Sequence, residues 1–295
     1  MFASNFDYHK PGSISDAVQL LSANNEAKVL AGGQSLIPLL KLRLARPSLV
    51  VDIGGIEELK RISVDGDTLR IGSLATHAQI ASSSHVLEAC EILAEAAGGV
   101  GDPAVRNRGT IGGNVSHADP ASDLPTVLTA LNADFNVQGQ GGLVSRGSRS
   151  VPASEFFIGA FTTSLAENEI LTGVDVPVLQ QNQVAEYAKM SHPATHFAVV
   201  GAAVVVTLDP GTVCTAASVA VGGLVPKPVR APSVENALVG QQLTQKLIAA
   251  AADSVVDDLG MDIIGDIYAS ADYRRSMAAI ELKHALFHAV GLAHH

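Results

Sequence analysis

The sequence predicts a protein of two parts, an N-terminal α/β region of about 175 residues and a C-terminal α+β region of about 110. Its 295 residues are enough for about two domains of ordinary size. In the first part, short apolar runs alternate with helical patterns, as in strand–helix–strand units. After residues 177–183, three runs rich in Val and Ala follow one another, which is typical of an antiparallel meander.

The start of the chain predicts a strand–helix–strand unit. Ser13 and Asp16 have the spacing of a capping box at the beginning of an amphipathic helix. The expected elements are a helix over 13–22, a strand over 28–31, a helix over 36–44 and a strand over 49–53. Because strands joined through a helix usually run parallel, we expect a parallel crossover here.

The rest of the N-terminal region continues to mix strands and helices. The expected elements are strands over 69–72, 133–138 and 169–176, a helix over 84–97 and a short helix over 125–131. Cys90 falls on the apolar face of the longer helix, so we expect an inert core thiol, and Gly98 is the stop signal of that helix. Residues 139–148 (GQGGLVSRGS) predict a hairpin loop.

The C-terminal region begins after residues 177–183 (PVLQQNQ), which lack helical or strand periodicity and form the expected boundary. The expected elements are strands over 184–190, 197–208 and 213–222 and helices over 244–258 and 271–290. The strands are expected to form an antiparallel sheet, and the two helices follow it in the chain.

The composition excludes several classes of protein. The chain carries 19 Lys and Arg against 29 Asp and Glu, a net charge of −10, so it lacks the basic character of a nucleic-acid-binding protein. Its two Cys, at 90 and 214, cannot supply an iron–sulfur cluster, a four-cysteine zinc site or a disulfide framework. The N-terminus lacks the apolar core of a signal peptide, and the longest apolar run, 197–206, is too short to cross a bilayer. We therefore expect a soluble cytoplasmic protein.

Two glycine-rich segments are the candidate binding loops. Residues 31–35 (AGGQS) lie between a predicted strand and a predicted helix, where backbone amides can approach a phosphate. The alternative for this segment is a tight turn with Ser35 as a helix N-cap. It matches neither the P-loop nor the six-residue dinucleotide pattern. Residues 110–114 (TIGGN) have similar chemistry, so a diphosphate held by the amides of both loops is expected. Asp123 could then bind a sugar hydroxyl or cap the next helix.

The histidine pairs predict no metal site. His284 and His288 are four residues apart on a predicted helix, but the Glu of a metalloprotease motif does not follow His284. His192 and His196 have the same spacing, but Pro193 lies between them and argues against a helix.

Several segments, taken together and in order, resemble the FAD-binding medium subunit of molybdenum hydroxylases. They are AGGQSLIPLLKLRLARPSLVVDIGGI (31–56), RNRGTIGGNVSHADPASDLP (106–125), FDYHKPGSISDAVQLL (6–21), EFFIGAFTTSLAENEIL (155–171) and KMSHPATHFAVVGAA (189–203). In these segments the chain most resembles the FAD subunits of aerobic carbon monoxide dehydrogenases. The FAD domain of xanthine dehydrogenase is a more distant resemblance.

The resemblance implies an α+β fold with an FAD-binding domain of the vanillyl-alcohol-oxidase (PCMH) type at 1–177, in subdomains of about 1–55 and 56–177. A carbon monoxide dehydrogenase flavoprotein C-terminal-like domain would follow at 178–290. Asp123 would bind the ribityl or ribose region, and Leu171 and Lys189 would lie near the flavin ring. The implied FAD-binding residues are Ala31, Gly32, Gly33, Gln34, Ser35, Leu36, Val100, Gly101, Thr110, Ile111, Gly112, Gly113, Asn114, Asp123, Leu171 and Lys189.

The resemblance also implies a role in a larger oxidoreductase. A large partner subunit would carry the molybdenum cofactor and a small one two [2Fe–2S] clusters, from which electrons pass through FAD to an external acceptor such as a quinone. The expected assembly is a dimer of heterotrimers in the cytoplasm, with association with the inner face of the membrane left open. Carbon monoxide is the first expected substrate. The alternatives are a hydroxylase of N-heterocycles or aldehydes and a self-contained flavin oxidase. No catalytic acid or base is expected on this chain.

Overall fold

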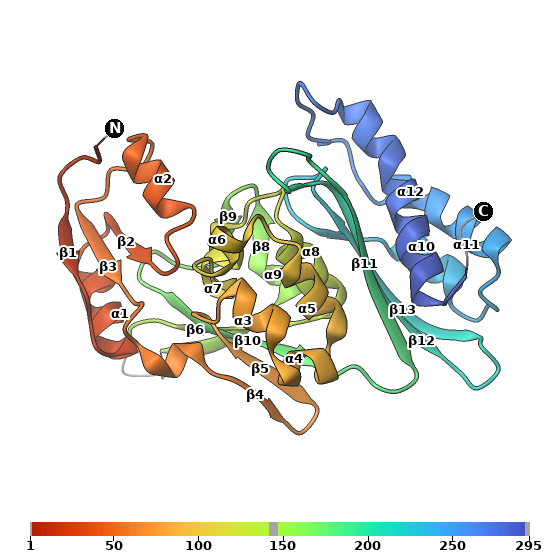
Figure 1. Cartoon of the computed structure of the whole chain (residues 1–295), viewed down its shortest axis with the longest axis horizontal. Helices are drawn as coiled ribbons and strands as arrows, with labels where there is room; N and C mark the ends of the chain where they lie inside the picture. Colours follow the sequence, from red (N-terminus) through yellow and green to blue (C-terminus); the bar gives the residue numbers. More distant parts are fainter. Residues whose placement is uncertain (1, 142–146, 293–295) are drawn as a thin grey trace.

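The computed structural model describes residues 2–141 and 147–292. The chain forms three parts that follow one another along the long axis of the molecule (Figure 1). A small N-terminal part lies at one end, a mixed part with most of the short helices lies in the middle, and a sheet with long helices lies at the C-terminal end.

The N-terminal part is a three-stranded parallel sheet with the order β1-β3-β2. Its elements are β1 (Asp7–His9), α1 (Ile14–Ala23), β2 (Ala27–Leu30), α2 (Leu36–Lys41) and β3 (Leu49–Asp52). The predicted parallel crossover between β2 and β3 is confirmed. Ser13 is the N-cap of α1, because its hydroxyl accepts a hydrogen bond from the Asp16 amide at 3.1 Å, which is one of the two bonds of the predicted capping box.

The middle part contains a five-stranded antiparallel sheet with the order β4-β5-β10-β6-β7. Its strands are β4 (Ile62–Asp65), β5 (Thr68–Gly72), β6 (Asp134–Gln138), β7 (Ser148–Pro152) and β10 (Ile170–Pro177), with a separate pair β8 (Phe157–Gly159) and β9 (Thr162–Thr163). Strand β4 was not predicted. The β6–β7 pairing forms the predicted hairpin, and residues 142–146 of its loop lie outside the described residues.

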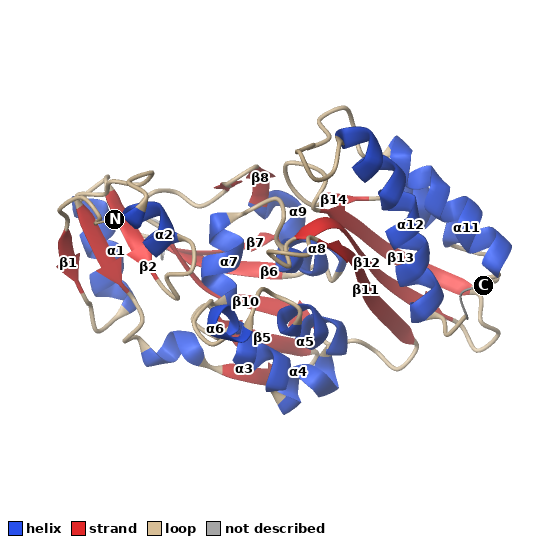
Figure 2. Ribbon diagram, turned by 45° about the horizontal axis from the view of Figure 1, so that its top comes forward, coloured by secondary structure: helices blue, strands red, loops and turns tan. Residues whose placement is uncertain are grey.

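Short helices cover this sheet and line its junction with the other two parts (Figure 2). They are η1 (Glu57–Lys60), α3 (His77–Ser82), α4 (Ser84–Ala89), α5 (Glu91–Gly98), α6 (Pro103–Arg106), α7 (Ile111–His117), α8 (Asp123–Ala130) and α9 (Ala153–Phe156). The prediction of one helix over 84–97 is wrong. The backbone of Cys90 (φ −163°, ψ 73°) leaves the helical region and separates α4 from α5. Cys90 is a buried core thiol, as predicted, and burial raises its pKa to about 12.

The C-terminal part is an antiparallel sheet with the order β11-β12-β13-β14, which confirms the predicted meander. Its strands are β11 (Gln183–Ser191), β12 (Ala198–Leu208), β13 (Cys214–Gly222) and β14 (Val229–Arg230). The helices are α10 (Pro232–Leu238), α11 (Gln245–Asp253), η2 (Ser254–Asp257) and α12 (Ala271–Ala289). The helix predicted over 244–258 is shorter, since its last turn is the 3₁₀ helix η2.

Strand β12 lies between two hydrophobic cores. Ala203 and Val205 belong to the core of the middle part, beneath α8, whereas Val204 and Val206 pack into the core under α12. A strand buried on both faces needs apolar residues at consecutive positions instead of at alternate ones. This explains why the sequence of β12 is an unbroken apolar run.

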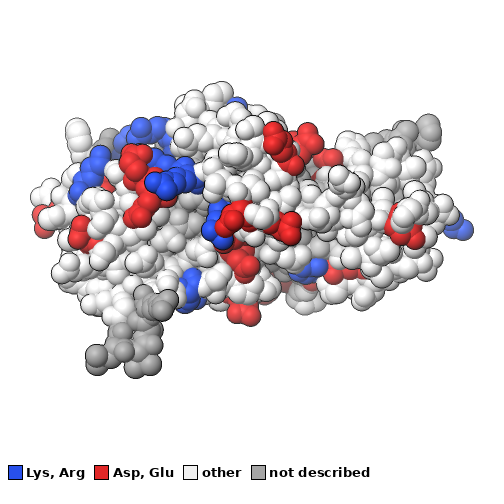
Figure 3. Space-filling model, turned by 90° about the horizontal axis from the view of Figure 1, so that it is seen from below, with Lys and Arg blue, Asp and Glu red and all other residues white. Residues whose placement is uncertain are grey.

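The net charge is distributed unevenly along the chain. Residues 1–72 hold eight basic and eight acidic residues, so the whole excess of acidic charge lies in 73–295. On the face in Figure 3, most of the basic side chains gather at the N-terminal end, where acidic side chains lie among them, and further acidic groups lie toward the middle and the C-terminal end. In the described part of the chain, no helix has both the length and the apolar character that crossing a bilayer requires.

Arg274 of α12 is the buried cation that ties this helix to the C-terminal sheet. Its Nη1 donates to the carbonyls of Val199 and Gly223, both at 2.9 Å, and its guanidinium pairs with Asp266. We predict that Arg274→Leu lowers the free energy of unfolding by about 3 kcal/mol, because the carbonyls of Val199, Gly223 and Ala269 lose a donor and the Asp266 carboxylate loses its cation.

The matched control for this prediction is Arg275→Leu. The Arg275 guanidinium donates one hydrogen bond, to the Gly260 carbonyl at 3.0 Å, so this substitution should cost less than about 1 kcal/mol. Urea unfolding of both variants measures the difference. Equal losses in the two variants would contradict the prediction.

Candidate functional site

A cavity of about 610 Å³ lies where the N-terminal part, the middle part and the 195–197 segment of the C-terminal part meet. Both glycine-rich loops line it, and so do 14 of the 16 residues singled out from the sequence. Those 14 are Ala31, Gly32, Gly33, Gln34, Ser35, Leu36, Val100, Gly101, Thr110, Gly112, Gly113, Asn114, Asp123 and Leu171.

Two of the residues singled out from the sequence do not line the cavity. The Ile111 side chain is fully buried in the core of the middle part, since it points inward from the first turn of α7. Lys189 lies behind the wall, where it pairs with Asp123. The structure therefore places neither side chain in the cavity wall, and their roles in FAD binding stay predictions.

The first loop presents a run of unpaired amides. Gly33 has φ +75°, and the N–H groups of residues 32–36 donate to no acceptor within the described chain. Ser35 occupies the N-cap position of α2, but its side chain makes no capping hydrogen bond. The alternative of a Ser35-capped turn therefore lacks its defining contact. Successive free amides at a positive-φ glycine form a concave anion-binding surface.

The amides of Ile111, Gly112 and Gly113 in the second loop donate hydrogen bonds to other groups of the protein. The N–H groups of Ile111 and Gly112 donate to the carbonyls of Ala75 (3.0 Å) and Ser73 (2.9 Å). The Gly113 amide donates to the Thr110 hydroxyl at 3.1 Å, which makes Thr110 the N-cap of α7. This differs from the expectation that both loops offer free amides. The second loop contributes a close-fitting glycine surface opposite the first.

The backbone of the first loop touches the backbone that leads into the second loop. A Cβ added to Gly32 would lie 2.0 Å from the Arg108 carbonyl oxygen and 2.9 Å from the Gly109 Cα. Only glycine fits at position 32, because real Cβ atoms do not approach backbone so closely. The contact brings two chain segments that both line the cavity directly together.

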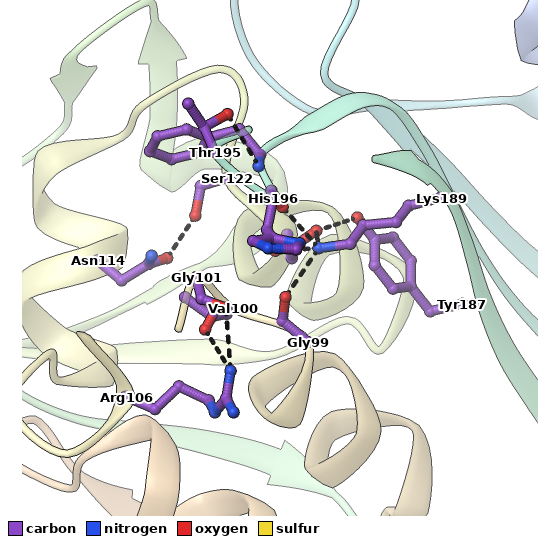
Figure 4. A network of polar contacts seen from close by, with 12 residues as sticks. Gly99, Val100, Gly101, Arg106, Asn114, Ser122, Tyr187, Lys189, Thr195 and His196 are labelled. Atoms are coloured by element: carbon purple, nitrogen blue, oxygen red, sulfur yellow. Dashed lines mark hydrogen bonds and ion pairs between the residues drawn. The ribbon is translucent and has the colours of Figure 1, made fainter. Parts of the chain in front are cut away.

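Figure 4 shows Tyr187 and Lys189 of strand β11 close to Gly99 of the middle part. Asp123 joins the middle part to the C-terminal sheet through these two side chains. Its carboxylate accepts a hydrogen bond from the Tyr187 hydroxyl at 2.7 Å, and its two oxygens lie 3.0 and 3.1 Å from Lys189 Nζ. Burial raises the pKa of Asp123, and Lys189 and Tyr187 counteract that effect. The N-cap of α8 is Ser122, so the alternative of Asp123 as a helix cap is wrong.

Two cations hold three successive carbonyls of the 99–101 segment. Lys189 Nζ donates to the Gly99 carbonyl at 3.0 Å, and Arg106 Nη1 donates to those of Val100 (3.1 Å) and Gly101 (3.0 Å). Lys189 Nζ also donates to the carbonyl of His196 at 3.0 Å. Lys189 thus fixes two cavity segments that are far apart in the sequence.

Several lining residues were not found from the sequence. Ser73 and His77 come from the segment after β5, and Phe161 and the 195–197 segment come from two distant loops. Burial, with a smaller effect of the Arg106 charge, lowers the pKa of His77 to about 4, so its imidazole is neutral at pH 7. Ser73 and His77 have no sequence signal of their own, because their neighbours in space come from elsewhere in the chain.

The histidine pairs predicted not to bind metal lie apart from each other. His284 of α12 faces Glu281, with 3.6 Å between Nδ1 and the carboxylate, whereas His196 lines the cavity and the His192 ring contacts Tyr268. No cluster of three metal-binding side chains occurs among residues 2–141 and 147–292.

The cavity fits a diphosphate held by amides instead of by cations. Lys28 is its one lining Lys or Arg among the described residues, whereas Asp119, Asp123 and Glu169 are acidic. The unpaired amides of the first loop supply the positive partial charges that an anion needs. Beyond them, the cavity is large enough for a sizeable organic cofactor and has an apolar wall that includes Leu36, Val100 and Leu171.

Both halves of the chain match known protein families. Residues 4–179 match the FAD binding domain in molybdopterin dehydrogenase, and residues 185–289 match the CO dehydrogenase flavoprotein C-terminal domain.

Similar proteins cover the chain nearly end to end. It is 38% identical to the 6-hydroxypseudooxynicotine dehydrogenase complex subunit alpha of Paenarthrobacter nicotinovorans, over 97% of this chain and 96% of that protein. It is 37% identical to the carbon monoxide dehydrogenase medium chain of Hydrogenophaga pseudoflava, over 97% of each. A solved structure of carbon monoxide dehydrogenase from H. pseudoflava, which lacks the Mo-pyranopterin moiety, superposes with a TM-score of 0.93 over 99% of both chains, at 37% identity. The chain belongs to the family of FAD-binding medium subunits of molybdenum hydroxylases.

Proposed function

We propose that this chain holds FAD in the 610 Å³ cavity and relays electrons from the [2Fe–2S] clusters of a small partner subunit to an external acceptor. The run of unpaired amides at residues 32–36 is the observation that carries the proposal. FAD, when bound, supplies the electron-transfer chemistry. The chain's own residues bind the diphosphate, shape the apolar wall and hold the 99–101 segment in place.

The proposed partners are a large subunit that carries the molybdenum cofactor and a small iron–sulfur subunit, arranged as a dimer of heterotrimers. Cys90 and Cys214 are both buried and too few for a cluster, so cluster ligands would have to come from a partner. The names of the relatives, "complex subunit alpha" and "medium chain", support an assembly of several subunits. The proposed division of the chain is an FAD domain at 1–177 and a C-terminal domain at 178–290.

Oxidation of carbon monoxide is the proposed activity of the complex, on the strength of the likeness to carbon monoxide dehydrogenase medium chains. A hydroxylase of N-heterocycles is the second candidate, because the 6-hydroxypseudooxynicotine dehydrogenase subunit is equally similar. A glyceraldehyde dehydrogenase medium chain at 36% identity supports an aldehyde as the third. The substrate pocket would lie on the large subunit, and the proposed acceptor is a quinone or another external carrier.

Gly33→Val tests the diphosphate site. Valine tolerates φ +75° poorly, so the amides of residues 32–36 should turn away from the phosphate and the Kd for FAD should rise at least about tenfold. Flavin absorbance after gel filtration measures the retained cofactor. Gly66→Val is the control, since Gly66 has φ +57° with open space around it in the β4–β5 turn. Equal retention of FAD by both variants would contradict the proposal.

Reconstitution tests the electron relay. The purified chain loaded with FAD should show no flavin bleaching when carbon monoxide, an aldehyde or an N-heterocycle is added under anaerobic conditions. Addition of the iron–sulfur and molybdenum subunits should restore bleaching with the true substrate, followed by 450 nm absorbance. Substrate-dependent bleaching by the isolated chain would instead support a self-contained flavin oxidase.

A further inference from the structure

Tyr187 and Lys189 reach from β11 toward the middle part. They are two residues apart on the strand, so their side chains leave the same face of the C-terminal sheet. That face packs on the middle part, because Ala203, which pairs with Tyr187 on β12, belongs to the core there. Both side chains contact the Asp123 carboxylate of α8. Lys189 supplies its counter-charge, and Tyr187 donates a neutral hydrogen bond at 2.7 Å.

The Tyr187 hydroxyl has room because residue 201 is a glycine. A Cβ at Gly201 would lie 2.5 Å from the hydroxyl oxygen and 3.1 Å from the ring carbons Cε2 and Cζ. Gly201 pairs with Lys189 inside β12, and every other residue from 198 to 206 is Ala or Val. A glycine inside a strand loses packing and costs backbone entropy. The strand thus gives up a side chain at the position that borders the hydroxyl.

The Asp123 carboxylate depends on these two partners for its charge. It is 3% exposed, and burial raises its pKa, whereas the Lys189 charge and the Tyr187 hydrogen bond lower that pKa. The Glu281 carboxylate of α12 also acts on Tyr187, whose pKa it raises. A neutral Asp123 would leave the Lys189 ammonium without its counter-charge.

The Lys189 ammonium links this arrangement to the cavity. Its Nζ donates to the carbonyls of Gly99 and His196, both at 3.0 Å (Figure 4). Gly99 directly precedes the lining residues Val100 and Gly101, and His196 lines the cavity with φ +59°. A non-glycine residue at positive φ is strained, so it persists only where its surroundings hold it. The ammonium is one of the groups that hold it.

We propose that Tyr187 is a positioning residue of the cofactor site. Its hydroxyl holds the Asp123 carboxylate in place against Lys189. The ammonium then keeps the 99–101 and 195–197 segments in the arrangement that binds FAD. Tyr187 does not line the cavity, so it acts through Asp123 and not by contact with the cofactor. The proposal rests on the assignment of FAD to this cavity.

Tyr187→Phe is the main test, and Tyr8→Phe is the matched control. The Tyr8 hydroxyl also donates to a carboxylate, that of Asp52, but neither residue lines the cavity. Tyr187→Phe should raise the Kd of the full chain for FAD roughly three- to tenfold at pH 7, the range for one lost hydrogen bond. Tyr8→Phe should leave it unchanged. Flavin fluorescence titration gives both constants.

The pH dependence of FAD binding separates positioning from a structural role. The Tyr187 hydrogen bond favours the ionised carboxylate, so its loss raises the pKa of Asp123 further. FAD affinity should fall as the pH drops through that pKa, because Lys189 then loses its counter-charge. In Tyr187→Phe this fall should begin at a higher pH than in the native chain or in Tyr8→Phe. A lower apoprotein melting temperature with a native Kd and a native pH profile would mark a purely structural tyrosine and overturn the proposal.

Gly201→Ala tests the same hydroxyl from the neighbouring strand. The added Cβ should displace the Tyr187 hydroxyl and weaken FAD binding about as much as Tyr187→Phe does. The double variant has no hydroxyl to displace, so its Kd should be close to that of Tyr187→Phe alone. Losses of affinity that simply add would contradict the proposal.

Amide hydrogen exchange of the apoprotein tests the two cavity segments without the cofactor. The amides of 99–101 and 195–197 should exchange faster in Tyr187→Phe and at the native rate in Tyr8→Phe. Native exchange, FAD affinity and pH profile in Tyr187→Phe would overturn this inference and leave the proposed function standing. Failure of the native chain to bind FAD would remove the proposed function, whereas a faster exchange in Tyr187→Phe would still support the positioning of the two segments.

Discussion

The contact between Gly32 and the Arg108–Gly109 backbone is the constraint on which the site depends. At this point the backbone of the first loop lies directly against the backbone of the middle part. Both glycine loops adjoin this contact: the amide run begins at Gly32, and α7 begins just after Gly109. A side chain at position 32 would separate the two parts and open the cavity at its narrow end.

The two glycine loops have similar sequences, but their backbone amides have different roles. The first loop leaves its amides free for a ligand. The amides of the second loop donate hydrogen bonds to the 73–77 segment and to the side chain of its own N-cap, Thr110. The second loop is therefore rigid before a ligand arrives, and its glycines serve close packing. A site of this kind binds an anion with preorganised dipoles, which cost little reorganisation.

The local parts of this architecture could be predicted from the sequence. The parallel unit, the meander and both glycine loops depend on neighbours along the chain, and their patterns are visible there. The pairing of Asp123 with Lys189 joins residues 66 positions apart, and no periodicity reports it. Cys90 keeps the helical apolar face, although its backbone breaks the helix, because a face pattern records burial and not φ and ψ. The inward direction of Ile111 follows from the helical geometry of α7, whereas the glycine-rich pattern of 110–114 predicts a loop.

The bond from Lys189 to the Gly99 carbonyl has a consequence for synthesis on the ribosome. The two groups are 90 residues apart, and chains grow at about 5–20 residues per second, so the 99–101 segment waits roughly 5–20 s for the ammonium that fixes it. During that time the nascent cavity also lacks its 195–197 wall. The complete cavity therefore forms only after strand β11 and the 195–197 segment have been synthesised.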